Sequence, residues 1–402
     1  MILYADFDYT KILRSFNFEE KLKKRHINLA YRNSKNYTLF LYAAAHEEFA
    51  SQLKVIAKNH YEEVAEQTVD LDNALNIAIQ SNNYKGAKVL LECGFDVNNK
   101  SYLDSTIPPL FLACITNNEE MVNLLLDYNA DTKREYDCNT PITYAIVHLA
   151  INAVRALVNS EKDLNLDFLE SVHGSALNAA LWEDYDEMVH LLLKAGANLE
   201  ITDEEKESIL RAPARLNNQI MLSYLIELGA DIDKADIEEG ETTLMYICKH
   251  GTLDAKYSYD MVKLLVLKGA NLFLKDKNGY TAMGYALRSQ NLQVIKYLKN
   301  KGLNTIKEDS EGLPFLFQTE NAEFLDFLLQ EGVDINRKLK TDKGKGNAEK
   351  DEYEYEILYY HDHPTMELFE VMQKHQDKME PELKEEFESM KFQMLISASK
   401  EL

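Results

Sequence analysis

Two histidines separated by one residue, in the stretch His-Asp-His-Pro at 361–364, are the first candidates for chemistry. Imidazole nitrogens bind zinc, and two of them on one short segment could supply half of a tetrahedral site. A structural zinc site normally has four protein ligands, and no further cluster of cysteine or histidine accompanies this pair. We therefore interpret His361 and His363 as exposed residues of a turn, and we predict no metal site.

A second candidate lies near the start of the chain, where an apolar run leads into Asp6 and Asp8, with Thr10 two residues further on. This sequence resembles the first motif of haloacid-dehalogenase-type phosphatases. The resemblance implies that Asp6 would be the nucleophile and Asp8 the acid/base, supported by a distant lysine and an acidic pair for magnesium on a parallel sheet. Repeated units begin near residue 36, which leaves no room for that sheet. We therefore predict no catalytic residues and no cofactor.

The composition excludes several classes of function. The 402 residues are 46% hydrophobic and 28% charged, with a formal net charge of −23. A surface this acidic repels phosphate backbones, which argues against a nucleic-acid partner. No apolar run is long enough to span a membrane, and the start of the chain lacks the basic segment of a signal peptide. The four cysteines form no C-x-x-C pair, which suits free thiols in the cytoplasm.

An internal repeat is the strongest signal in the chain. The stretch EMVHLLLKAGANLE at 187–200 has near copies at 120–133 and 260–273. When the copies are aligned on the Asp or Asn near their end, the phrase recurs about every 34 residues, a period typical of stacked structural units. The aligned positions are Asp96, Asp131, Asp163, Asn198, Asp231, Asn271, Asn304 and Asp334.

Each unit carries the signals of two short helices. Thr140 can cap the first helix of its unit, and Pro141 suits the first turn, where a missing N–H is not needed. A second helix carries a Leu-Leu pair such as Leu191-Leu192 and ends at a glycine such as Gly196, which can adopt the left-handed conformation without strain. Asn129 and Glu161 stand in place of this glycine in two units, so their turns depart from the pattern.

These parts resemble the ankyrin repeat, with its T-P-L-H-x-A opening, two antiparallel helices and G-A-D-V-N turn. The clearest matches are ECGFDVNN at 92–99, LGADIDKAD at 228–236 and DKNGYTAMGYAL at 276–287. The likeness covers about residues 72–336, with a degenerate unit before it at 36–49. It implies an all-α fold, an α-solenoid of stacked helix-turn-helix units that number about nine or ten with the degenerate ends.

The predicted domain organisation follows from where the repeat fails. We expect an N-terminal cap segment at 1–35 and an ankyrin repeat array at 36–336. A charged stretch at 337–353, almost free of apolar residues, is predicted to be a flexible loop. A degenerate repeat and a C-terminal capping helix are expected at 354–402.

Two irregularities interrupt the array. One unit is longer than the others because of an insertion, TLDAKYS at 252–258, between its two helices. We expect this insertion to form a protruding loop. Pro213 lies inside a predicted first helix, which it should kink or shorten because proline cannot donate a backbone hydrogen bond.

Binding in a solenoid uses the concave face, which here would include exposed positions late in each first helix. Trp182, the only tryptophan, occupies one of them, and tryptophan is enriched in interface hot spots. Basic residues occupy the later ones, in a chain with excess negative charge. We therefore predict a protein-binding strip of Trp182, Arg215, Lys249, His250 and Arg288. The full row is Gln80 and Ser81, Ile115 and Thr116, Val147 and His148, Trp182 and Glu183, Arg215 and Leu216, Lys249 and His250, and Arg288 and Ser289.

The function that this fold implies is a non-catalytic protein-interaction scaffold. Its partner would be a protein with an acidic segment, bound on the concave face by a monomeric cytoplasmic chain. One alternative is a bacterial effector, secreted into a host cell by a bacterial secretion system, or an immunity-type inhibitor built on the same scaffold. The other is an enzyme whose site lies in the atypical terminal segments.

Overall fold

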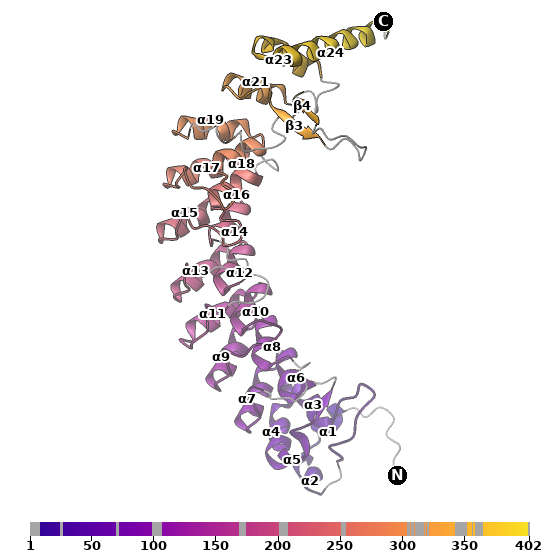
Figure 1. Ribbon diagram of the computed structural model, residues 1–402. Coiled ribbons are helices and arrows are strands. Elements are labelled where there is room, and N and C mark those ends of the chain that lie inside the picture. The colour runs from indigo at the N-terminus through magenta and orange to yellow at the C-terminus, as the bar shows by residue number, and fades with distance from the viewer. Residues whose placement is uncertain are drawn as a thin grey trace. The chain divides into compact units, whose positions relative to one another are not determined.

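The computed structural model describes most of the chain and divides it into two compact units, Met1–Leu216 and Asn217–Leu402. Both units are built almost entirely from short helices, which form antiparallel pairs that stack on one another as an α-solenoid (Figure 1). The described residues are 9–24, 27–69, 72–98, 107–168, 174–200, 208–250, 255–303, 306, 309, 317, 319, 321–341, 352–355, 357 and 365–400.

In the first unit, the first helices of successive pairs contact one another in chain order, and the second helices stack beside them (Figure 1). The first helices are α3 (Leu39–Ala45), α6 (Ala74–Gln80), α8 (Pro109–Ile115), α10 (Pro141–Val147), α12 (Ala176–Trp182) and α14 (Arg211–Arg215). The second helices are α4 (Ala50–Asn59), α7 (Tyr84–Glu92), α9 (Glu119–Asp127), α11 (Ile151–Asn159) and α13 (Asp186–Lys194). The remaining elements are α1 (Tyr9–Leu13), α2 (Phe18–Lys23), η1 (Glu47–Phe49), α5 (Tyr61–Val64), β1 (Thr68–Val69) and β2 (Asp72–Asn73).

The second unit contains the same helix pairs and ends in a longer helix. Its helices are α15 (Gln219–Glu227), α16 (Thr243–His250), α17 (Ala255–Leu267), α18 (Ala282–Arg288), α19 (Leu292–Asn300), α21 (Ala322–Gln330), α23 (Met366–Lys374), η2 (Gln376–Lys378) and α24 (Pro381–Lys400). Its two strands are β3 (Lys338–Thr341) and β4 (Glu352–Tyr355).

The local sequence explains why each helix begins where it does. The Thr140 side chain accepts a hydrogen bond from the Thr143 N–H, and the Thr143 side chain accepts one from the Thr140 N–H, which forms a reciprocal cap at the start of α10. Pro141 occupies the first turn, as predicted. Asparagine side chains cap several second helices by accepting a single backbone hydrogen bond. Asn118, for example, accepts from the Met121 N–H at 2.9 Å at the start of α9. Such caps stabilise a helix by about 1 kcal/mol each.

The turn after each second helix keeps one geometry even where the sequence changes. Gly94 and Gly196 both have φ of +91°. Asn129 and Glu161, which replace the glycine, have φ of +62° and +55° and so adopt the same left-handed conformation. The fold therefore tolerates the backbone strain of a side chain at these two turns, because the packed helices on either side fix the path of the chain.

The recurring Asp or Asn closes the turn that follows. Its side-chain Oδ1 accepts a hydrogen bond from the N–H two residues on, for example Asp96 from Asn98 at 2.9 Å and Asp231 from Asp233 at 3.0 Å. In some units the second residue is Asn or Asp and accepts from the following unit, as Asn98 Oδ1 does from the Asp131 N–H at 2.8 Å. This ladder of Asx turns is the physical reason for the sequence period.

Two predicted irregularities turn out differently in the structure. Residues 255–258 of the insertion are helical, so α17 has 13 residues where α19 has 9. The prediction that 337–353 is a flexible loop is wrong for its described part, because β3 pairs with β4 in an antiparallel register that runs from Lys338↔Tyr355 to Thr341↔Glu352. Backbone pairing between strands does not require apolar side chains, so the low apolar content was misleading.

Pro213 has the predicted effect on its helix. The helix α14 has 5 residues, whereas α12 has 7. The preceding residues Ile209 and Leu210 form a turn instead of a longer helix. Because proline lacks the N–H that the helix interior needs, the helix begins close to Pro213.

The C-terminal helices are attached by polar contacts as well as by apolar packing. Asp326 of α21 accepts hydrogen bonds from Lys374 Nζ at 2.7 Å, His375 Nε2 at 2.7 Å and Gln330 Nε2 at 2.8 Å. Burial acts to raise the pKa of Asp326, but the three donors together outweigh it and lower the pKa to about 2. The Phe369 and Phe387 rings stack at 5.0 Å and join α24 to α23.

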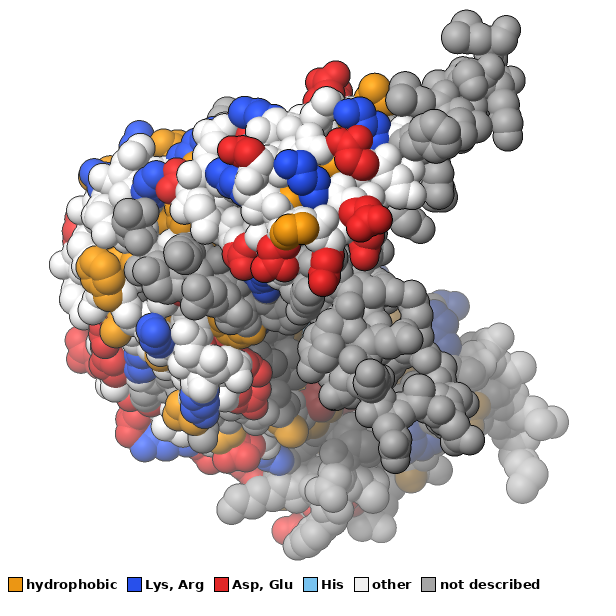
Figure 2. All heavy atoms as spheres, turned by 45° about the horizontal axis from the view of Figure 1, so that its top comes forward, with side chains coloured by type: hydrophobic (Ala, Val, Ile, Leu, Met, Phe, Trp, Pro, Cys, Tyr) orange, Lys and Arg blue, Asp and Glu red, His pale blue; other side chains and the backbone are white. Residues whose placement is uncertain are grey.

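On the face shown in Figure 2, acidic and basic side chains lie interspersed, with hydrophobic side chains scattered between them. Scattered single hydrophobic residues are ordinary for a protein surface and do not mark a binding site by themselves. A binding surface has to be located from the repeat positions instead.

Candidate functional site

The predicted row coincides with the ends of the first helices. In the first unit, Gln80, Ile115, Val147, Trp182 and Arg215 are the last residues of α6, α8, α10, α12 and α14. In the second unit, Arg288 is the last residue of α18, and α16 ends at Lys249 and His250. Neighbouring first helices are in contact within each unit. Equivalent residues therefore follow one another along the edge of a unit.

Trp182 and Arg215 form a stacked pair in the first unit. The Arg215 guanidinium carbon lies 5.0 Å from the centre of the Trp182 ring. Trp182 is half-buried and Arg215 is exposed. Arg215 forms no ion pair with any residue that the structure describes. The pair thus presents a positive charge whose attraction to the ring is worth about 0.5–1 kcal/mol, and whose carboxylate-binding edge is available.

Lys249, predicted to have the same role, lies in a different environment. Its Nζ forms a short ion pair with Glu241 Oε1, and the Glu241 side chain is only 4% exposed. Lys249 also lies 5.4 Å from the centre of the Tyr285 ring. The charge of Lys249 is therefore neutralised within the second unit.

A buried polar cluster surrounds this ion pair. The Tyr285 hydroxyl lies 2.7 Å from Glu241 Oε1 and 2.6 Å from Asp276 Oδ2, and all three side chains are buried. Burial, followed by the hydrogen bonds to the two carboxylates, raises the pKa of Tyr285 well above its usual value. Asp276 also accepts from the Tyr280 N–H at 2.7 Å, so it fixes a turn as well as the phenol.

The two remaining predicted residues are both exposed. The His250 ring lies beside the Tyr246 ring in a tilted arrangement, with ring centres 4.4 Å apart. Arg288 forms no ion pair with a described residue. Of the predicted strip, Trp182 with Arg215 lies in the first unit, and Lys249, His250 and Arg288 lie in the second. Its continuity from one unit to the other stays a prediction.

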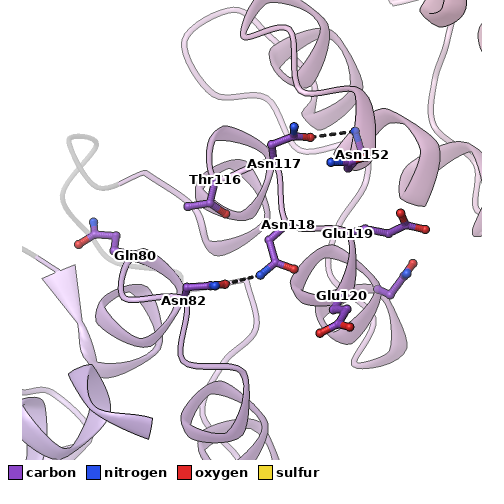
Figure 3. A pocket seen from close by; sticks show the side chains of 9 residues that line it. Gln80, Asn82, Thr116, Asn117, Asn118, Glu119, Glu120 and Asn152 are labelled. Atoms are coloured by element: carbon purple, nitrogen blue, oxygen red, sulfur yellow. Dashed lines mark hydrogen bonds between the residues drawn. The ribbon is translucent and has the colours of Figure 1, made fainter.

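Sequence reasoning missed a polar hollow of about 840 Å³ in the first unit, at the turns between first and second helices (Figure 3). Gln80 and Thr116 belonged to the predicted row, but the other lining residues did not. We call it the asparagine hollow. Its lining residues are Gln80, Asn82, Thr116, Asn117, Asn118, Glu119, Glu120, Asn123 and Asn152.

Paired asparagines build this hollow. Asn82 and Asn117 have φ of +53° and +51°, a left-handed conformation that asparagine adopts more readily than most residues. Asn118 donates a short hydrogen bond to Asn82 Oδ1 across the repeat boundary, and Asn117 Oδ1 accepts from the Asn152 N–H at 2.8 Å (Figure 3). These contacts hold the amides in place while other polar atoms face the hollow.

A sequence signal for the hollow did exist. Between a first and a second helix, the dipeptide Asn-Asn occurs at 82–83, 117–118 and 217–218. The first asparagine supplies the left-handed turn and the second caps the next helix, as Asn83 does by accepting from the Gly86 N–H at 2.7 Å. Two such turns in successive repeats bring amides together.

The residues considered for catalysis or metal binding, Asp6, Asp8, His361 and His363, lie outside the described residues. Within the part of the chain that the structure describes, no group of three or more His, Cys, Asp or Glu side chains could hold a metal ion. No described helix combines the length and the apolar character that a membrane crossing requires.

The cysteines are free thiols. Cys114 and Cys248 are buried, and burial raises the pKa of Cys114 to about 12. Its thiol therefore stays protonated and unreactive at neutral pH.

Comparison with known proteins agrees with this architecture. A family model described as ankyrin repeats in three copies matches residues 103–168 and 253–338. The B-cell lymphoma 3 protein homolog of Mus musculus is 27% identical over 208 residues, which are 49% of this chain and 44% of that protein. The phosphocholine transferase AnkX of Legionella pneumophila is 24% identical over 300 residues, which are 68% of this chain and 30% of that protein.

A solved structure shows the same fold. The ankyrin repeat domain of Bcl-3 superposes with a TM-score of 0.50 at 26% identity, covering 57% of this chain and 100% of that domain. The chain spans less than half of the length of the curated relatives reported above.

Proposed function

Because the chain is an ankyrin-repeat protein, a class that mediates protein–protein interaction, we propose that it is a non-catalytic scaffold that binds a partner on the edge formed by its first-helix ends. The observation that carries the proposal is the Trp182–Arg215 pair. A half-buried tryptophan offers a large area that a partner can desolvate, and the exposed guanidinium offers two parallel donors to a carboxylate.

The chemistry of this pair indicates the class of partner. A carboxylate beside the indole would be bound by Arg215 in an environment partly shielded from water, where such contacts are stronger. An apolar side chain would cover the exposed part of Trp182. The partner is thus a protein segment with an acidic residue next to an apolar anchor, and Arg288 in the second unit offers another exposed cation for an acidic segment.

Affinity capture with the full chain, followed by mass spectrometry, would supply candidate partners. Each candidate is then titrated against the wild-type chain by calorimetry. Trp182→Ala is expected to weaken binding by about 2 kcal/mol, or about thirtyfold, as truncation of a hot-spot tryptophan does. The helical circular dichroism spectrum should stay unchanged, because Trp182 is the last residue of α12 and is only half-buried.

A matched control uses Lys194, an exposed residue at the end of the second helix α13. Lys194→Glu reverses a charge in the first unit, whereas Trp182→Ala changes none. The reversed charge lies away from the first-helix ends. Its effect on affinity should be small. A partner whose affinity responds to Lys194→Glu and ignores Trp182→Ala would overturn the proposal.

A further inference from the structure

The asparagine hollow and the Trp182–Arg215 pair lie at two places along the same edge of the first unit. The hollow includes Gln80, the last residue of α6, and Trp182 and Arg215 are the last residues of α12 and α14. The helices α6, α8, α10, α12 and α14 contact one another in that order. One extended segment of a partner could therefore pass over both places.

The hollow is suited to a basic group. Glu119 and Glu120 line it, and neither forms an ion pair or hydrogen bond with any described residue. None of the lining residues is Lys, Arg or His. Arg155 contacts the lining by donating to Asn152 at 3.1 Å, and it is already paired with Glu187 at 2.7 Å. The two carboxylates thus remain available to a cation.

The amides add directional acceptors and donors to this charge. Gln80 Nε2 donates to Asp72 at 2.7 Å, which leaves its Oε1 free to accept. Asn123 is exposed and forms no hydrogen bond with a described residue. A guanidinium or ammonium group needs several acceptors around it, and a neighbouring peptide group needs a donor and an acceptor. The hollow supplies both kinds, and its own hydrogen bonds hold the turns fixed.

The stretch between the two places contains exposed apolar side chains, together with the exposed His148. Ile115 at the end of α8 is 39% exposed, and Leu149, just after α10, is 50% exposed. Val147, the last residue of α10, is half-buried. The edge therefore has three zones in chain order, which are an acidic hollow, an apolar middle and the cationic aromatic pair.

We propose that this edge binds one extended partner segment that carries a basic residue for the asparagine hollow, apolar residues for the middle zone and an acidic residue for Arg215. The inference rests on the proposed function and adds a charge order to it. Neighbouring helices pack about 8–10 Å apart, so the three steps from α8 to α14 span roughly 24–30 Å. An extended chain rises about 3.3 Å per residue, which places the two charged residues roughly seven to nine positions apart.

Selection of a displayed library of random 16-residue peptides on the full chain provides the probe. Enriched peptides are expected to carry one basic and one acidic residue at that spacing with apolar residues between them. For a synthetic peptide of this kind, exchanging the two charged residues should lower the affinity measured by fluorescence anisotropy about tenfold or more, because both charged contacts are then lost.

Variants of the chain assign each charge to its zone. The double variant Glu119→Gln, Glu120→Gln should abolish the preference for the basic residue, and Arg215→Gln the preference for the acidic one. Asp127→Asn is the matched control, because it removes a charge from the far end of the same helix α9. The combined reversal Glu119→Lys, Glu120→Lys, Arg215→Glu should bind the exchanged peptide better than the original.

The outcomes separate this inference from the proposed function. Peptides that require Trp182 but are indifferent to Glu119 and Glu120 would overturn the charge order and leave the scaffold proposal standing. If every enriched peptide is indifferent to Trp182→Ala, or none is enriched, both proposals are contradicted. Restored binding of the exchanged peptide by the reversed variant supports the inference directly.

Discussion

Arg215 and Lys249 hold the same place in the repeat but have opposite roles. Each lies at the end of a first helix, with its charge over an aromatic ring, at 5.0 Å from Trp182 and 5.4 Å from Tyr285. Arg215 is exposed and forms no ion pair with a residue that the structure describes, whereas Lys249 is paired with the buried Glu241. The repeat position therefore places a cation on the edge, and its neighbours decide whether the cation serves binding or stability.

The largest expected effect is on the free energy of unfolding, which should fall more for a substitution at Lys249 than for one at Arg215. Lys249→Met removes the positive charge that neutralises the buried Glu241, which should cost about 3 kcal/mol of unfolding free energy. Arg215→Met removes only the attraction to the Trp182 ring, which should cost about 1 kcal/mol at most. Urea denaturation followed by circular dichroism measures both. Equal losses of unfolding free energy in the two variants would contradict the different roles assigned to Arg215 and Lys249.

The second test concerns the phenol of Tyr285, whose ring lies beneath the Lys249 ammonium group. Tyr285→Phe deprives Glu241 and Asp276 of a buried donor, so a loss of about 2 kcal/mol is expected. Tyr144 provides the control, because it is also buried, holds the matching position in α10, and its hydroxyl makes no hydrogen bond with a described residue. Tyr144→Phe should be close to neutral in thermal melts. A costly control and a neutral Tyr285→Phe would contradict the assigned role of the cluster.

Asp326 is a third charged residue in this comparison, and its contribution to stability depends on pH. Its pKa in the folded chain is about 2, below the usual 3.8, so its stabilisation is present above pH 4 and is lost as the pH falls toward 2. Asp326→Asn should therefore cost on the order of 1–2 kcal/mol at pH 7, and the difference from the wild type should vanish near pH 2. Melting curves across this range test it, and a difference that does not change with pH would refute it.

The smallest effect is on the rate of association and concerns the two exposed cations Arg215 and Arg288. Once a partner is known, Arg215→Glu with Arg288→Glu should slow association roughly tenfold at low ionic strength and flatten its salt dependence. Lys194→Glu with Lys263→Glu, on exposed parts of second helices, carries the same change in charge and should slow association less. Stopped-flow measurements at two salt concentrations distinguish them. The same slowing by both pairs would mean that only net charge matters.

Much of the fold could be predicted from the sequence because each repeat contains the residues that begin and end its helices. Thr140 and Pro141 begin a helix, Gly196 ends one, and the Asp or Asn closes a turn, all within one repeat. The insertion was predicted less well, because spacing alone does not show whether extra residues join a loop or lengthen the next helix, as residues 255–258 do.

The candidate site was predictable only as a row of positions. Counting along the repeat located Trp182 and Arg215, and the structure brings them together. It could not show that Lys249 is neutralised, because its partners Glu241 and Tyr285 are 8 and 36 positions away and meet it only after folding. The asparagine hollow was missed because its lining comes from three successive repeats, and no single repeat contains it.

The ladder of Asx turns also determines how the chain should come apart. Where it links described turns, it joins neighbouring ones, as Asn98 does with Asp131 and Asp233 does with Asn271, each at 2.8 Å. Unfolding can therefore advance from an end one repeat at a time, and amide exchange should be fastest at the termini and slowest in the interior of each unit. A ligand bound across several repeats would block this stepwise unfolding, because unfolding would stop at the first repeat that the ligand contacts.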